Sequence, residues 1–145
     1  MKHCLTILTV LVLTLTLSLP AMADDIPDLT GTWEGTRSSM VHHGDKTVFV
    51  EESPGMTYVI ERQEGRLIMG RKITVRKVDG QKHDEPFVGV ISADGSAISL
   101  ADFEAGYAFG RILGPADLEI TYLSDGTSPT DKNMVAGIHR LKRTQ

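Results

Sequence analysis

The sequence predicts an all-β protein, a single eight-stranded antiparallel up-and-down barrel, and two observations lead to this fold class. Strong turn dipeptides, Asp79-Gly80, Asp94-Gly95 and Asp125-Gly126, separate short apolar runs, with weaker stops between them at intervals of roughly 8 to 15 residues. Between the stops, apolar residues alternate with period two, as in Met56, Tyr58 and Ile60. No long stripe of helical period competes with this alternation.

We expect eight strands, separated by these turns. Their predicted ranges are Thr30–Val41, Met56–Gln63, Leu67–Val78, Phe87–Ser92, Ala97–Phe103, Tyr107–Leu113, Leu118–Leu123 and Met134–Lys142. The β-prone stretch Lys46–Glu52 either continues the first strand around a bulge or forms a ninth strand. Closing the sheet into a barrel removes its unpaired edges, whereas a β-sandwich is the alternative fold.

The first 23 residues have the composition of a secretory signal peptide. Lys2 and His3 precede an apolar run over Leu5–Leu19, and Ala21-Met22-Ala23 follows as a cleavage pattern. The run is shorter than the roughly 20 apolar residues of a membrane-spanning helix, and a retained anchor is the alternative. We therefore predict cleavage after Ala23, one domain over residues 24–145, and a periplasmic or secreted location.

Composition limits the partners of the predicted mature chain. Cys4 is the only cysteine and leaves with the signal, so the domain has no disulfide. The net charge of the full chain is −4, and loss of Lys2 makes it −5. Nucleic acid and anionic membranes are unsuitable partners for this charge, and no membrane insertion is expected.

The stretch Leu29-Thr30-Gly31-Thr32-Trp33 opens the first predicted strand and contains the only tryptophan. Glycine allows close approach of the chain beneath a barrel, and an indole ring can plug its narrow end. Together with the ending "AGIHRLKR", this stretch resembles the calycin superfamily of lipocalin-like barrels, and is most similar to the avidin type. The resemblance implies a barrel floor made by Gly31 and Trp33, with Arg140, Lys142 or Arg143 against the indole.

The biotin pocket of the avidin type is not matched. Avidins line it with several tryptophans and an asparagine two residues after the Gly-x-Trp tryptophan, whereas this chain has only Trp33, and Gly35 at that position. Ser39 is the single match to a biotin-contacting serine.

Two arginines lie in the apolar phase of their predicted strands. Arg71 shares the phase of Leu67 and Met69, and Arg111 shares that of Phe109. If these phases face inward, each guanidinium needs a partner, because an unpaired charge inside a barrel is costly. The partner is then Asp102, Glu104, or the carboxylate or phosphate of a ligand; alternatively, a bulge or a strand end turns the arginines to solvent.

Three tyrosines complete the predicted ligand site. Tyr58, Tyr107 and Tyr122 occupy the more apolar phase of their strands, from which their hydroxyls can reach a small ligand or simply the rim.

Metal and catalytic motifs are not found in the sequence. His42 and His43 are adjacent on a strand and point to opposite faces, and His83 and His139 belong to no known metal-binding spacing. The serines lie in no nucleophile elbow, and no loop has the pattern of a phosphate cradle. We expect no metal, no cofactor and no enzymatic activity.

The predicted function is therefore binding of an unknown small molecule in the open mouth of an exported barrel. The alternative is a periplasmic inhibitor of a protease or lysozyme that acts through Asp24–Asp28, Gly44–Gly55 or Asp125–Asn133. An open cavity of at least roughly 300 Å³ favours the small molecule. Apolar residues in the outward phase, such as Val59 and Ile68, also suggest a homo-oligomer.

Overall fold

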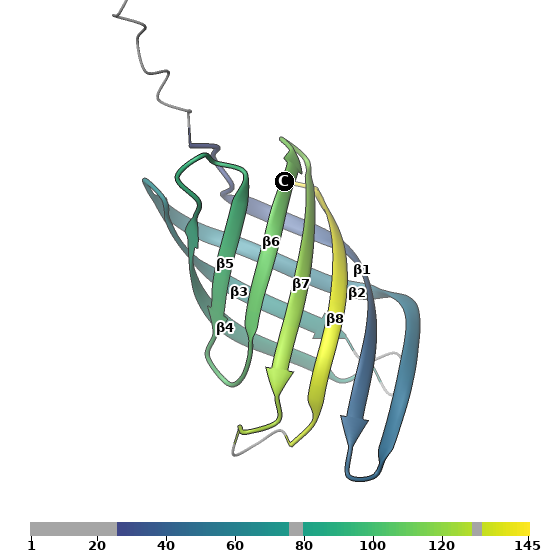
Figure 1. Ribbon diagram of the computed structural model, residues 1–145. Coiled ribbons are helices and arrows are strands. Elements are labelled where there is room, and N and C mark those ends of the chain that lie inside the picture. The colour runs from purple at the N-terminus through teal and green to yellow at the C-terminus, as the bar shows by residue number, and fades with distance from the viewer. Residues whose placement is uncertain (1–25, 76–79, 129–131) are drawn as a thin grey trace, which may run out of the picture.

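The computed structural model describes residues 26–75, 80–128 and 132–145, and these form a closed antiparallel barrel (Figure 1). The eight strands are β1 (Gly31–His43), β2 (Lys46–Glu64), β3 (Leu67–Val75), β4 (Lys82–Ile91), β5 (Ala97–Asp102), β6 (Tyr107–Gly114), β7 (Asp117–Asp125) and β8 (Met134–Arg143). Each strand pairs with the next in sequence, and β8 pairs with β1 to close the sheet. The predicted up-and-down barrel is thus confirmed.

Within the described residues, the strand boundaries differ from the prediction by more than two residues in two places. Lys46–Glu52 is neither a continuation of the first strand nor a ninth strand, because it forms the start of the long β2 that pairs with β1. β4 begins at Lys82 rather than at Phe87, so charged residues before Phe87 belong to the sheet. The predicted signal segment 1–23 lies outside the described residues, as does the end of the strand expected to reach Val78.

Large apolar side chains fill one end of the barrel. Trp33 is completely buried there, and its Nε1 donates a hydrogen bond to the Leu29 carbonyl at 2.9 Å. The other fully or nearly fully buried apolar side chains include Ile60, Ile91, Ile98, Leu118, Ile120 and Leu141. The C-terminal residues meet the start of β1 at this floor, where the backbone N–H of Thr32 donates to the carbonyl of Gln145 and that of Thr144 donates to the carbonyl of Thr32.

Inward-facing glycines make room for these large side chains. Gly70 lies opposite Phe87, and Gly110 lies opposite Ile98, in the strand register. A Cβ on either glycine would collide with the side chain of its partner. The narrow interior therefore holds one large residue of each such pair, with a glycine beside it.

In the described residues, no helix is long and apolar enough to cross a membrane.

Candidate functional site

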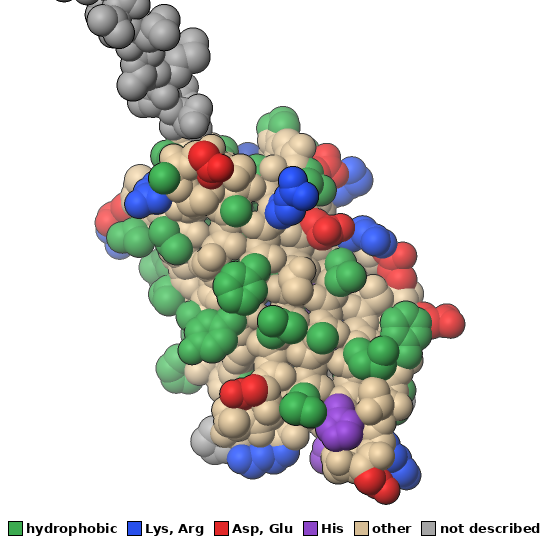
Figure 2. Space-filling view, viewed as in Figure 1, with side chains coloured by type: hydrophobic (Ala, Val, Ile, Leu, Met, Phe, Trp, Pro, Cys, Tyr) green, Lys and Arg blue, Asp and Glu red, His purple; other side chains and the backbone are tan. Residues whose placement is uncertain are grey.

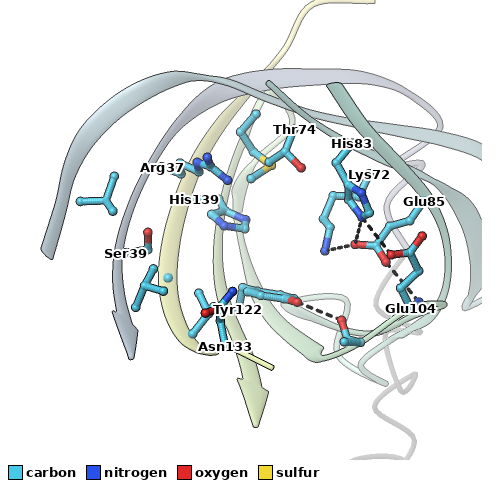
Figure 3. Close-up of a pocket in the computed structure, with 16 residues that line it drawn as sticks. Arg37, Ser39, Lys72, Thr74, His83, Glu85, Glu104, Tyr122, Asn133 and His139 are labelled. Carbon is cyan, nitrogen blue, oxygen red and sulfur yellow. Dashed lines mark hydrogen bonds and ion pairs between the residues drawn. The ribbon is translucent and has the colours of Figure 1, made fainter. Parts of the chain in front are cut away.

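The end of the barrel opposite Trp33 opens into a cavity of about 520 Å³ (Figure 3). The β1–β2 hairpin projects beyond the rim at this end (Figure 1), and the end of β1 pairs there with the start of β8, His42 opposite Met134. The cavity is lined by Arg37, Ser39, Val41, Val50, Met56, Lys72, Thr74, His83, Glu85, Glu104, Ala105, Tyr122, Asn133, Val135, Gly137 and His139. The volume lies within the range of small-molecule sites.

A buried lysine forms the charged centre of the cavity wall. Lys72 reaches inward from β3, and its Nζ lies 2.7 Å from Glu85 Oε1 and also pairs with the Asp102 carboxylate. The same Nζ lies 4.2 Å from the centre of the Tyr122 ring, as expected of a cation-π contact. Burial lowers the pKa of Lys72, but attraction to Asp102, and then to Tyr122 and Glu85, outweighs it and raises the pKa overall.

The Lys72 amine therefore keeps its proton. A protonated amine is not a nucleophile, so this lysine is unsuited to imine formation. One ammonium also serves two carboxylates, which leaves an excess negative charge, and burial raises the pKa of Asp102. The three side chains form a buried ionic cluster, in which Asp102 Oδ1 has no hydrogen-bond partner.

His139 and the two inward tyrosines form a second, neutral group. The Tyr58 hydroxyl lies 3.1 Å from His139 Nδ1, and the Tyr122 ring stacks on the imidazole with 6.0 Å between ring centres. Burial lowers the pKa of His139 to about 3, with repulsion from Lys72 and Arg37 adding to the effect. Burial also raises the pKa of Tyr58 well above its ordinary value, so its hydroxyl can donate to the neutral imidazole.

Arg37 carries the remaining positive charge of the cavity wall. It extends inward from β1, directly opposite His139 in the pairing of β1 with β8, and its guanidinium points into the cavity (Figure 3). Its Nε is buried and has no hydrogen-bond partner, and its guanidinium pairs with no carboxylate among the described residues. Burial lowers its pKa from the ordinary value, which expresses the cost of this environment.

A histidine and two glutamates meet at the rim. His83 Nε2 lies 3.6 Å from Glu85 Oε1 and 3.5 Å from Glu104 Oε2, and the three ligand atoms lie within 4.8 Å of one another. A divalent cation can be held by such donors, but the Lys72 ammonium already occupies the same Glu85 oxygen. A metal ion here would face that ammonium at short range. The absence of a metal site stays a prediction.

The structure brings only two of the five predicted ligand-site residues into the interior. Tyr58 and Tyr122 face inward, whereas Tyr107 is 63% exposed on the outer wall. Arg71 lies outside, with its Nη2 2.8 Å from Asp84 Oδ1, and Arg111 is exposed on β6. The structure therefore turns Arg71 and Arg111 to solvent, which was the alternative to an inward register, and it leaves Tyr107 outside the cavity.

The physical reason is the glycines of the interior. On β3 the inward residues are Ile68, Gly70, Lys72 and Thr74, and on β6 they are Ala108, Gly110 and Ile112. In both strands the outward phase is the more apolar one. Hydrophobicity alone therefore indicates the wrong face of each of these strands as the inner one. Ile68, expected on the outside, is buried in the core.

Trp33 is buried at the floor, and of the three basic residues offered as its partner, Arg143 lies against the indole. The guanidinium of Arg143 lies 5.4 Å from the Trp33 ring and donates to the carbonyls of Asp28 and Thr30. Arg140, another of the three residues offered for this role, is exposed and lies 3.6 Å from both Glu52 and Glu119. The two arginines are three residues apart on a strand, so they face opposite sides of the sheet.

Sequence reasoning missed Arg37, Lys72, Glu85 and His139 as cavity residues. A usable signal exists for two of them. Arg37 lies in the same alternating phase as the buried Trp33, and Glu85 lies in that of the buried Phe87. Counting from a large aromatic anchor would have placed both side chains inside.

Comparison with known proteins supports the fold alone. No family model and no curated protein matches the chain. Among solved structures, the chain is similar to a redesigned β-barrel, with a TM-score of 0.52 and 11% sequence identity over 86% of this chain and 98% of the other. This likeness shows the barrel fold alone, and no family is identified.

Proposed function

We propose that this protein binds a small organic molecule in the open end of its barrel, and that it does so after export to the periplasm or the cell exterior. The observation that carries the proposal is the cavity of about 520 Å³, which exceeds the roughly 300 Å³ that a small-molecule site requires. Apolar side chains fill the floor, and polar groups point into the open end.

The proposed ligand is not biotin, although the start and end of the sequence resemble the avidin type of calycin barrel. Gly35 occupies the place of the avidin asparagine, and a Cβ there would collide with the Arg140 carbonyl oxygen. The single indole lies at the floor, where Arg143 and Leu29 surround it. Neither feature supports the recognition of biotin through tryptophans and this asparagine.

Native mass spectrometry of the protein purified from the producing organism tests the proposal. We expect a non-covalently bound small mass on the wild-type barrel, and its loss in a Ser39→Trp variant, because Ser39 lines the cavity and an indole there would occupy it. The matched control is Ser99→Trp, since Ser99 lies on the outer wall. This variant should keep the bound mass.

Two results would contradict small-molecule binding. A wild-type barrel that is empty in every preparation would exclude a retained ligand. A bound protein that survives Ser39→Trp would favour the inhibitor alternative, in which the loops make the contact.

A further inference from the structure

We infer that the ligand is an organic monoanion with an apolar body, whose carboxylate is received by Arg37. This inference rests on the proposed function and names the ligand class of the same cavity.

The first step is the missing counter-charge of Arg37. Arg37 is half-buried, with its Nε fully buried, and a charged group in such a place usually has a partner because an uncompensated charge shielded from water is costly. Arg37 has none among the described residues, and its buried Nε makes no hydrogen bond. A planar guanidinium receives a carboxylate through two parallel hydrogen bonds, so a ligand carboxylate supplies both the charge and the acceptors that the site lacks.

The second step is that the acidic groups nearby are already engaged. Glu85 and Asp102 both pair with Lys72 on the other side of the cavity. Glu104 lies at the rim beside His83. The neighbours of Arg37 across the strand pairs are Ser53 on β2 and His139 on β8, and neither carries a negative charge.

The neutral state of His139 leaves the attraction of an anion at this position to Arg37. The low pKa of His139 means that the imidazole adds no positive charge at neutral pH. Arg37 is therefore the one cavity-lining cation, within the described part of the chain, that holds no carboxylate. The Glu85 and Glu104 carboxylates on the far wall would repel a second anionic group, which is why we infer a monoanion.

The third step is the apolar wall that leads outward from Arg37. Val41 and Val135 lie opposite each other on β1 and β8, and Val50 comes from the adjoining β2. All three line the cavity where the β1–β2 hairpin extends past the rim. A ligand with its carboxylate on Arg37 would lay an apolar body along these valines, which removes apolar surface from water on both partners.

A matched pair of probes tests the inference: 2-naphthoate and its neutral carboxamide, 2-naphthamide, titrated by calorimetry. The two probes differ in charge but hardly in shape. We expect the wild-type protein to bind the carboxylate roughly tenfold to a hundredfold more tightly than the amide, because hydrogen bonds between charged groups are stronger than neutral ones.

Two variants test whether the preference for the carboxylate depends on Arg37. Arg37→Gln should lower the affinity for 2-naphthoate to that for 2-naphthamide and leave the amide affinity unchanged. Arg71→Gln, which removes an arginine from the outer wall, should change neither affinity. If Arg37→Gln does not fold, as judged by circular dichroism, Arg37→Lys keeps the charge and should retain a weaker preference for the carboxylate.

Equal wild-type affinities for the two probes, or a preference that survives Arg37→Gln, would overturn the inference. Binding of neither probe would overturn it too. The proposed function is tested separately, by the native mass spectrum. A neutral or cationic bound molecule there would support small-molecule binding and contradict an anionic ligand.

Discussion

At the scale of single residues, the cavity wall places a charged lysine close to a neutral histidine. Lys72 is held protonated by its two carboxylates, whereas His139, close to the same ammonium, is held neutral. Burial disfavours the charged form of both side chains, but only the lysine has anionic partners. The neutral imidazole can accept a hydrogen bond from the Tyr58 hydroxyl, which a protonated ring could not do.

His139 should make the fold sensitive to acid. Its pKa is 6.5 in the unfolded chain and about 3 in the folded protein, so the unfolded chain takes up the proton first as the pH falls. Stability from this residue is therefore complete above about pH 6.5 and decreases toward pH 3. The loss approaches roughly 1.4 kcal/mol for each pH unit within that window.

Urea unfolding at a series of pH values between 7 and 4 measures the effect. His139→Gln should lose less stability on acidification than the wild-type protein, although its stability at pH 7 is lower. His42→Gln, near the tip of β1, should follow the wild-type slope. Parallel curves for wild type and His139→Gln would contradict a neutral buried imidazole.

At the scale of strands, the sequence contained enough information to locate most strands along the chain. It did not show which face of each strand points into the barrel. Asp-Gly pairs located the turns, as at Gly95, whose φ of 69° suits glycine. The boundary of β2 was missed because Ser53, Pro54 and Gly55 interrupt the apolar alternation inside a continuous strand. The faces of β3 and β6 were missed because glycine on the inside leaves no hydrophobic signal there.

The floor of the barrel depends on the contact between β8 and β1. We expect Arg143→Ala to lower the free energy of unfolding by about 1 to 2 kcal/mol, because it removes the cation-π contact with Trp33 and the hydrogen bonds to Asp28 and Thr30. Arg140→Ala should change it by no more than about 0.5 kcal/mol, since its ion pairs are exposed.

Urea unfolding followed by the fluorescence of Trp33, the only tryptophan, reports directly on this floor. The native emission should also shift to longer wavelength in Arg143→Ala if water reaches the indole. Equal effects of the two arginine substitutions would show that Arg143 has no special role at the floor.

At the scale of the whole molecule, the outer surface carries many exposed apolar side chains. One row of outward residues runs through successive strand pairs around the barrel. It consists of Met69, Val88, Ala101, Tyr107, Leu123, Ala136, Met40 and Phe49, each opposite the next. Hydrophobic side chains gather over the face formed by β5 to β8, with few charged ones at its centre (Figure 2).

The homo-oligomer stays a prediction, and this apolar row now gives the reason for it in place of Ile68. Contiguous apolar surface on a soluble protein commonly marks an interface, and a second copy presents an identical row to it. We expect the sedimentation coefficient to rise with protein concentration as copies associate through this face.

A Tyr107→Lys variant should remain monomeric at the concentrations where the wild-type protein associates, because the change places a charge within the row. The control is Phe103→Lys in the turn between β5 and β6. Phe103 is 80% exposed and Tyr107 is 63% exposed, so each substitution replaces an exposed aromatic ring with the same cation, but only one lies in the row. Association that persists in Tyr107→Lys, or that Phe103→Lys abolishes equally, would place the contact outside the row. A wild-type protein that stays monomeric throughout would contradict the oligomer itself.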